Sequence, residues 1–102
     1  MKLVHTLRAR GFFTIVAGTR RSQAATMILR PEQSTGSADN IHADADQWLY
    51  VVSGSGQAIV DGRKLTLESG SLLLIEAGEA HEISNPGQEP LVTINVYAPP
   101  AY

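Results

Sequence analysis

The sequence predicts an all-β protein, and three observations support this prediction. The chain has 102 residues, the size of one domain, and 43% of them are hydrophobic, which is enough for one small core. Short apolar stretches alternate with turn residues from one end of the chain to the other. No long stretch has the 3.6-residue period of an amphipathic helix. Many short strands at this spacing predict a β-sandwich or a β-barrel.

Nine stretches are predicted to be strands, each followed by turn residues. In chain order they are Leu3–Leu7, Phe12–Ala17, Ala24–Leu29, Trp48–Val52, Gln57–Val60, Lys64–Leu67, Ser71–Ile75, His81–Ser84 and Leu91–Tyr97. Asp61-Gly62 stands between two of these strands and predicts a tight hairpin, because both central residues of such a turn need positive φ. Gly54-Ser55-Gly56 predicts another β-turn, since no helix follows it that could hold a phosphate.

The segment 37–47 fits two structures. Apolar residues recur at helical spacing from Ile41, with Ser37 as a suitable N-cap. Alternatively, Asn40 and His42 point the same way from a strand, and a loop follows at Asp44–Asp46. The local pattern does not decide between a helical turn and a strand with a loop.

Composition excludes several classes of function. Only 18% of the residues are charged and the formal net charge is -2, so no basic surface favours nucleic-acid or anionic-membrane binding. The chain has no cysteine, which excludes disulfides, thiolate metal sites and a cysteine nucleophile. The longest aliphatic run, Leu72–Ile75, is far too short to span a bilayer, and the first residues do not resemble a signal peptide. We therefore expect a cytoplasmic protein without nucleic-acid or membrane partners.

Two spaced motifs carry a resemblance to a known family. They read Asn40-x-His42-x4-Gln47-x6-Gly54 and Gly70-x5-Glu76-Ala77-Gly78-x2-His81-x3-Asn85. These motifs, at about 36–56 and 70–85, resemble the two conserved segments of the cupin superfamily, and the likeness extends from Pro31 to Tyr97. The resemblance implies a small single-domain cupin over residues 1–102, with a double-stranded β-helix (jelly-roll) barrel.

The chain departs from the usual cupin pattern at three positions. Asn40 stands where the first histidine is usual, Gln47 where a glutamate is usual, and Glu76 where a proline is usual. The phrases Ala45-Asp46-Gln47-Trp48 and Tyr97-Ala98-Pro99-Pro100 look like one branch of small cupins. The tail of that branch often ends in histidine, whereas this chain has Tyr102.

The resemblance also implies a site at the mouth of the barrel. His42, Gln47 and His81 would line it, with Asn40 beside them as the weakest member of the set. Imidazole nitrogen and amide oxygen suit divalent iron, manganese, nickel, zinc or copper. Every one of these ligands is neutral, so the affinity for a cation should be lower than with glutamate.

Other polar residues near the motifs are expected to stay outside this site. Asp44 and Asp46 are predicted to be solvated loop residues. His5 lies in the predicted N-terminal strand, matches neither motif, and is expected to be structural.

Alternation along the strands predicts the wall of the cavity and an outer apolar row. If Gln47 points inward, Leu49 and Val51 also point inward, and Trp48, Tyr50 and Val52 point outward. The cavity wall is then expected to contain Met27, Leu29, Leu49, Val51 and Ile83. An outward row with two aromatic residues is costly to leave in water, so we expect a homodimer.

Two hypotheses for function follow. The first is a metal-dependent enzyme, such as an oxygenase or isomerase, that acts on a small polar metabolite. The second is a non-catalytic binding or sensory protein in which the same residues hold a small molecule without a metal. The two histidines favour the first hypothesis and Asn40 favours the second, and the sequence does not decide whether the protein is an enzyme.

Overall fold

The computed structural model describes residues 1–36 and 41–102. Within them the chain forms a short 3-10 helix and eight strands: η1 (Thr6–Arg8), β1 (Phe13–Gly18), β2 (Gln23–Leu29), β3 (Asp46–Ser53), β4 (Gly56–Val60), β5 (Arg63–Leu67), β6 (Leu72–Ile75), β7 (His81–Ser84) and β8 (Leu91–Ala98). None of the helical structure in these residues is long and apolar enough to cross a membrane. The prediction of an all-β protein is confirmed.

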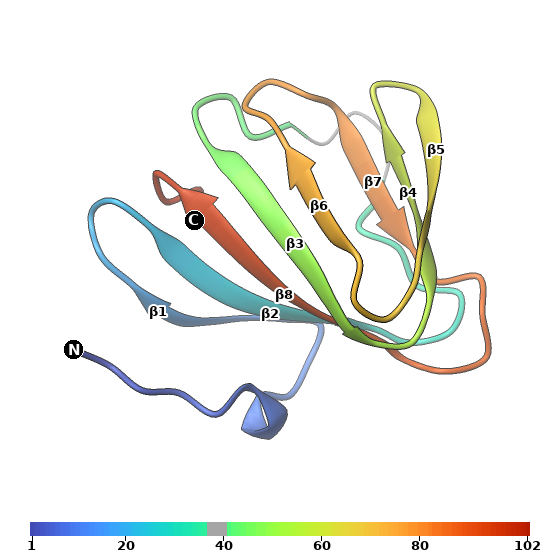
Figure 1. Cartoon of the computed structure of the whole chain (residues 1–102), viewed down its shortest axis with the longest axis horizontal. Coiled ribbons are helices and arrows are strands. Elements are labelled where there is room, and N and C mark those ends of the chain that lie inside the picture. Colours follow the sequence, from blue (N-terminus) through green and yellow to red (C-terminus); the bar gives the residue numbers. More distant parts are fainter. Residues whose placement is uncertain (37–40) are drawn as a thin grey trace.

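The strands form two antiparallel sheets that share one core (Figure 1). The larger sheet has the order β1-β2-β8-β3-β6, and the smaller has the order β5-β4-β7. Both sheets contribute to the main cluster of buried side chains, which includes Leu29, Leu49 and Leu91 from the larger sheet and Ala58 and Ile83 from the smaller. Because both inner faces contribute to this core, the two sheets close into a flattened barrel.

The alternation predicted for β3 is confirmed. Gln47, Leu49 and Val51 are buried, whereas Trp48 and Tyr50 are exposed on the outer face. This pleat places the polar Gln47 in the same inward row as two core residues. Because Gln47 is the second residue of β3, its buried amide group lies at the end of the barrel where this strand begins.

Two turns follow the predicted backbone chemistry. Asp61 and Gly62 join β4 to β5 with φ values of 46° and 81°, as a tight hairpin requires. Gly54 has φ of 85°, and a Cβ at this position would overlap the carbonyl oxygen of Pro90. The last glycine of the first motif is therefore needed for both conformation and space.

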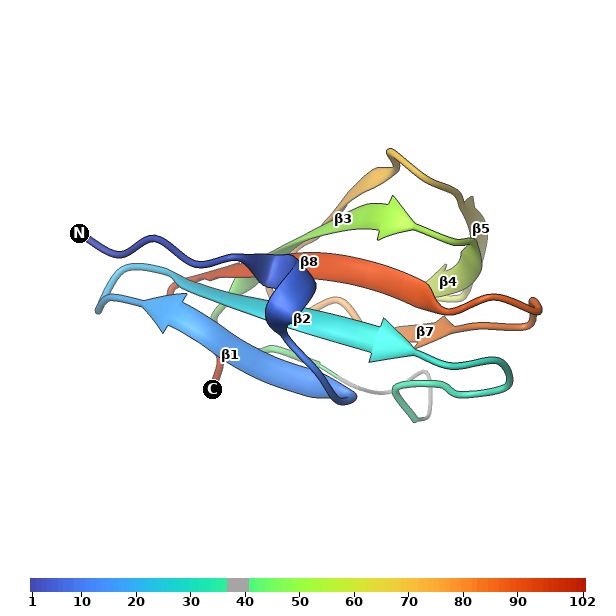
Figure 2. The ribbon, with the colours of Figure 1, turned by 90° about the horizontal axis from the view of Figure 1, so that it is seen from below.

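One predicted strand is absent, and the structure narrows one alternative that the sequence left open. Leu3–Leu7 is not a strand: the segment contains η1, in which the amide N–H of Arg8 donates to the carbonyl oxygen of His5. It crosses the outer face of β2 and β8 instead of pairing with a strand edge, and its alternation therefore has no ladder to support it (Figure 2). Residues 41–45 are not helical and lead directly into β3, while Ser37 and Asn40 lie outside the described residues.

Candidate functional site

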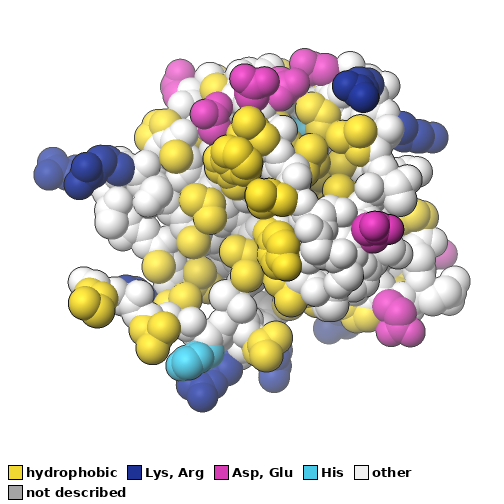
Figure 3. Space-filling model, in the orientation of Figure 1, with side chains coloured by type: hydrophobic (Ala, Val, Ile, Leu, Met, Phe, Trp, Pro, Cys, Tyr) yellow, Lys and Arg dark blue, Asp and Glu magenta, His cyan; other side chains and the backbone are white. Residues whose placement is uncertain are grey.

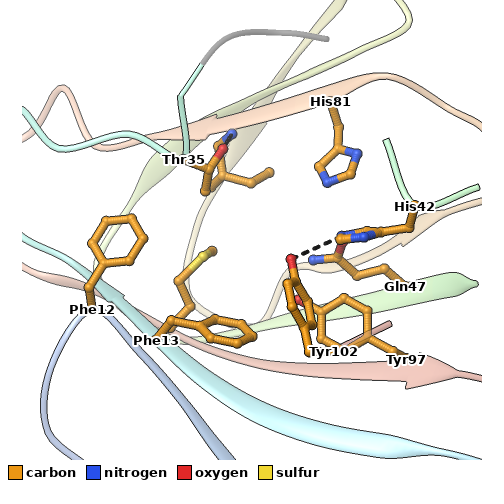
Figure 4. A pocket seen from close by; sticks show the side chains of 10 residues that line it. Phe12, Phe13, Thr35, His42, Gln47, His81, Tyr97 and Tyr102 are labelled. Atoms are coloured by element: carbon orange, nitrogen blue, oxygen red, sulfur yellow. Dashed lines mark hydrogen bonds between the residues drawn. The ribbon is translucent and has the colours of Figure 1, made fainter. Parts of the chain in front are cut away.

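A cavity of about 130 Å³ lies among the inward side chains (Figure 4). Its lining comes from β1, β2, β3, β7 and β8, and from the segments beside them. The lining residues are Phe12, Phe13, Met27, Thr35, His42, Gln47, His81, Ile83, Tyr97 and Tyr102. A few polar groups thus face an otherwise mostly apolar wall, as is typical of small-molecule sites.

The two motifs are joined by two hydrogen bonds beside the cavity. The carbonyl oxygen of His42 accepts a hydrogen bond of 2.9 Å from the amide N–H of Gly78. The Oδ1 atom of Asp46 accepts a hydrogen bond of 2.9 Å from the amide N–H of Ala77. The segment that carries His42 is therefore fixed against the turn that leads to His81. The centroids of the two imidazole rings are 5.1 Å apart, and Figure 4 shows both rings on one side of the cavity.

A backbone contact selects the tautomer of His81. This side chain is only 2% exposed, and its Nδ1 atom lies 3.1 Å from the carbonyl oxygen of Glu79. Because a carbonyl oxygen only accepts, Nδ1 carries a hydrogen, and in the tautomer with this contact the lone pair lies on Nε2. An Nδ1–H···O=C bond of this kind orients many metal-binding histidines.

Gln47 supplies an oxygen that lacks a hydrogen-bond donor. Its side chain is 3% exposed, and its Nε2 atom donates to Asn95 Oδ1 at 2.9 Å. Its Oε1 atom is buried and makes no hydrogen bond of good geometry among the described residues, although it lies close enough to the His42 ring for the amide to oppose the lowering of the His42 pKa. Buried polar atoms are rarely left in this state, so this acceptor beside two imidazoles is a place where a donor or a cation can bind.

Two tyrosines form the aromatic side of the site. The ring of Tyr102 lies 5.3 Å from that of His42 and 5.2 Å from that of Tyr97. Its hydroxyl oxygen is 3.4 Å from His42 Nε2, which is a long contact. Gln23 holds the backbone of Tyr102, because its Nε2 donates to the Tyr102 carbonyl oxygen at 2.8 Å and its Oε1 accepts from the Tyr102 N–H at 3.0 Å. The tail of the chain is thus fixed over the mouth of the cavity.

Burial and neighbouring groups keep His42, Tyr97 and Tyr102 neutral near pH 7. Burial lowers the pKa of His42, and the nearby His81 lowers it further, although the neighbouring Gln47 amide opposes the shift. Burial raises the pKa of Tyr97, and Tyr102 adds to the rise. Burial also raises the pKa of Tyr102, with Tyr97 acting in the opposite direction. The site therefore offers a neutral His42 imidazole and two phenols that keep their protons.

The structure brings together most of the residues that the motifs singled out. His42, Gln47 and His81 line one cavity with Met27 and Ile83. The other three residues expected in the wall, Leu29, Leu49 and Val51, lie in the buried core and do not line the cavity. Each of them is two or four residues farther along its strand than Met27 or Gln47, at a level where the two sheets are packed together.

The remaining candidate site residues lie apart from the cavity or outside the described residues. Asp44 is exposed outside the strands, as expected for a solvated loop residue. Asp46 is also exposed, but the prediction of a loop residue is wrong for it, because it begins β3 and its carboxylate accepts the Ala77 N–H. His5 is also exposed and does not contribute to the cavity. Asn40 lies outside the described residues.

Sequence reasoning did not assign several lining residues to the site. Tyr97 follows Thr93 and Asn95 at every second position of β8, so alternation along that strand was a usable signal. Phe13 and Thr35 carry no periodic or motif signal, because they reach the cavity from the edge strand β1 and from an irregular segment.

The donor chemistry suits a divalent transition ion. Among residues 1–36 and 41–102, no three His, Cys, Asp or Glu side chains converge as a metal-binding group. The histidine pair nevertheless lies beside the unpaired oxygen of Gln47, and imidazole with amide oxygen is an acceptable set for first-row metals.

A barrel of two antiparallel sheets with histidine and amide side chains in its cavity defines a protein of the double-stranded β-helix class. A model of the cupin domain matches residues 25–97, and the chain belongs to the cupin family. No curated protein matches the chain.

Solved structures agree with this assignment. The chain is similar to BH2720 from Bacillus halodurans, with 28% identity, a TM-score of 0.87, and coverage of 95% of this chain and 76% of that one. It is also similar to TT1209 from Thermus thermophilus, with 21% identity, a TM-score of 0.86, and coverage of 97% and 98%. A predicted oxalate decarboxylase from Thermotoga maritima shares 25% identity, with a TM-score of 0.72 and coverage of 79% and 69%.

Proposed function

We propose that this cupin binds a divalent transition metal through His42, Gln47 and His81, and that the metal and cavity together hold a small polar metabolite. The observation that carries the proposal is the unpaired, buried Gln47 oxygen beside two imidazoles. A cation would satisfy this oxygen and would take the lone pair of His81 Nε2. The metal is iron, manganese, nickel, zinc or copper, all of which accept such donors.

The size of the cavity limits the ligand. Its volume is about 130 Å³, compared with roughly 300–1,000 Å³ for pockets that hold drug-sized molecules. This space suits a metal ion with a compact acid of a few carbon atoms. The similarity to a predicted oxalate decarboxylase supports a ligand of that size and polarity.

The residues of the chain would orient such a ligand. When bound, a metal of this kind polarises a ligand oxygen as a Lewis acid. The Tyr97 and Tyr102 phenols, which keep their protons because burial raises the pKa of each, can donate hydrogen bonds to ligand oxygens. Phe12 and Phe13 cover the opposite side and reduce contact with water. A metal-dependent oxygenase or isomerase would need these same elements.

A second candidate function is non-catalytic binding of a small molecule. The observation that favours it is the neutral donor set, since Gln47 replaces a carboxylate and no described acidic side chain lines the cavity. In this case the histidines and Gln47 would hydrogen-bond the ligand directly.

Elemental analysis separates these two candidates. Protein purified without an affinity tag is loaded with each metal, desalted and analysed, together with His81→Ala and the matched control His5→Ala, which removes an exposed histidine. We expect wild type and His5→Ala to keep less than one metal per chain and His81→Ala to keep none. Equal metal in wild type and His81→Ala would show that the ligand assignment is wrong. No metal in any protein would favour non-catalytic binding.

We also propose a homodimer through the outer face of the larger sheet. Five apolar side chains on this face are 36–62% exposed: Trp48, Tyr50, Leu72, Leu74 and Val96. The register makes them neighbours, because Trp48 is paired with Leu74 and with Val96 on the adjacent strands. Figure 3 shows hydrophobic side chains gathered over β3 with no charged group among them. An uncharged apolar face is best covered by a like face, as in a two-fold dimer.

A further inference from the structure

A chain of buried hydrogen bonds runs from the core to the candidate site. Thr93, Asn95 and Gln47 are 0%, 0% and 3% exposed. The Thr93 hydroxyl bonds the Met27 carbonyl oxygen at 2.9 Å, Asn95 Nδ2 bonds Thr93 Oγ1 at 3.0 Å, and Gln47 Nε2 bonds Asn95 Oδ1 at 2.9 Å. Nothing in the two sequence motifs pointed to Thr93 or Asn95.

Elementary hydrogen-bond chemistry determines which group donates in each of these hydrogen bonds. The Met27 carbonyl can only accept, so the Thr93 hydroxyl must donate its single hydrogen to it. Thr93 Oγ1 is then an acceptor, and Asn95 must turn its NH₂ group toward it. The oxygen of Asn95 therefore faces Gln47, which must donate its own NH₂ group. The oxygen of Gln47 is the atom left over for the site.

We propose that Thr93 and Asn95 are positioning residues that fix Gln47 with its oxygen available to the cavity, so that this point binds a cation or a hydrogen-bond donor and rejects an acceptor such as a carboxylate. The direction of the chain does not depend on a metal, but its use for a cation rests on the function proposed above. A reversed Gln47 amide would place two hydrogens against a cation and remove one of its three ligands.

The anchor at Thr93 offers a matched pair of variants. Thr93→Val removes the hydroxyl that accepts from Asn95, so no hydrogen bond to residue 93 then favours either orientation of the Asn95 amide. Thr93→Ser keeps the hydroxyl and should preserve the direction. If both Gln47 orientations become equally populated in Thr93→Val, half of the molecules present the oxygen, and the dissociation constant for Ni²⁺ rises about twofold.

Solvent exchange of the Gln47 side-chain NH₂ group reports the direction without any metal. In metal-free ¹⁵N-labelled protein, we expect this group to exchange at least about tenfold more slowly than the exposed Gln88 NH₂ group. Thr93→Ser should keep this protection, whereas Thr93→Val should lose most of it. Calorimetric titration with Ni²⁺ is then carried out on the same three proteins.

The outcomes test the positioning of Gln47 and the metal site separately. Rapid exchange of the Gln47 NH₂ group in wild type overturns the proposal, and this measurement stands even if Thr93→Val does not fold. Unchanged protection in a folded Thr93→Val also overturns it. Protection as expected with no Ni²⁺ binding supports the positioning role and shows that the proposed metal function is wrong. Ni²⁺ binding without protection supports the metal site and overturns the positioning role.

Discussion

Replacing Asn85 with alanine should destabilise the fold and leave the site intact. Asn85 is the last residue of the second cupin motif, and its side chain is 1% exposed. It makes three hydrogen bonds to the backbone: Nδ2 donates to the carbonyl oxygens of Leu29 and Glu89, and Oδ1 accepts from the N–H of Gly87. It does not line the cavity. The motif asparagine therefore joins loops and does not bind a ligand.

The size of the effect follows from these contacts. A hydrogen bond of this kind contributes about 0.5–1.5 kcal/mol net, so the three together contribute about 3 kcal/mol. In a domain of this length, 1 kcal/mol lowers Tm by about 4–8 °C, which gives a fall of roughly 12–24 °C for Asn85→Ala. Since small domains are stable by about 5–15 kcal/mol, the variant should still be folded at room temperature.

Urea unfolding followed by circular dichroism and by the fluorescence of Trp48 measures this loss. The control is Gln88→Ala, an exposed position in the same loop, which should change stability by less than about 0.5 kcal/mol. A loss below about 1 kcal/mol for Asn85→Ala would refute the bond-by-bond reasoning. Weaker metal binding by folded Asn85→Ala would refute its purely structural role.

Two further predictions concern His42 and the outer face. The pKa of His42 is lowered from 6.5 in the folded protein, so the unfolded chain binds more protons at this residue. The stability that neutral His42 contributes is therefore present above pH 6.5 and is lost as the pH falls through the lowered pKa. Thermal unfolding of metal-free protein between about pH 7 and about pH 5 should therefore show a smaller loss of stability in His42→Gln than in wild type, and equal losses would contradict the lowered pKa. Tyr50→Lys places a charge in the exposed apolar row and should convert a dimer into a monomer in light scattering after size-exclusion chromatography. The control Lys64→Ala changes an exposed residue of β5 and should remain dimeric, whereas a wild-type monomer would show that the dimer prediction is wrong.

The sequence was informative where local chemistry and packing agree. Strand His81–Ser84 has the predicted bounds, because a turn at Gly78 shortly precedes it and Asn85-Pro86-Gly87 follows it. Alternation also fixed which face of β3 is buried. Alternation reports only whether a side chain points inward, however, and not how far along the barrel it lies. Leu49 and Gln47 share a face, yet one belongs to the core and the other to the cavity.

Other parts of the site depend on contacts between distant residues. Tyr102 reaches the cavity because Gln23, 79 positions earlier, holds its backbone, and no periodic pattern records such a contact. The Leu3–Leu7 segment shows the opposite case, since its alternation was strand-like but the segment contains η1 and pairs with no strand.

The contact between Gln23 and the tail has a consequence for the kinetics of binding. Three hydrogen bonds join this side chain to the backbone of Ala101 and Tyr102. At about 1 kcal/mol each, and with the ring contacts of Tyr102 added, they hold the tail over the mouth in all but fewer than about one molecule in a hundred. A ligand that enters by this route waits for that minor open state. Gln23→Ala should therefore raise the rates of association and dissociation together in stopped-flow experiments and leave their ratio nearly unchanged, whereas a change in the ratio alone would show that Gln23 acts on the bound state. The residence time of a ligand would then be set by a side chain that does not line its cavity.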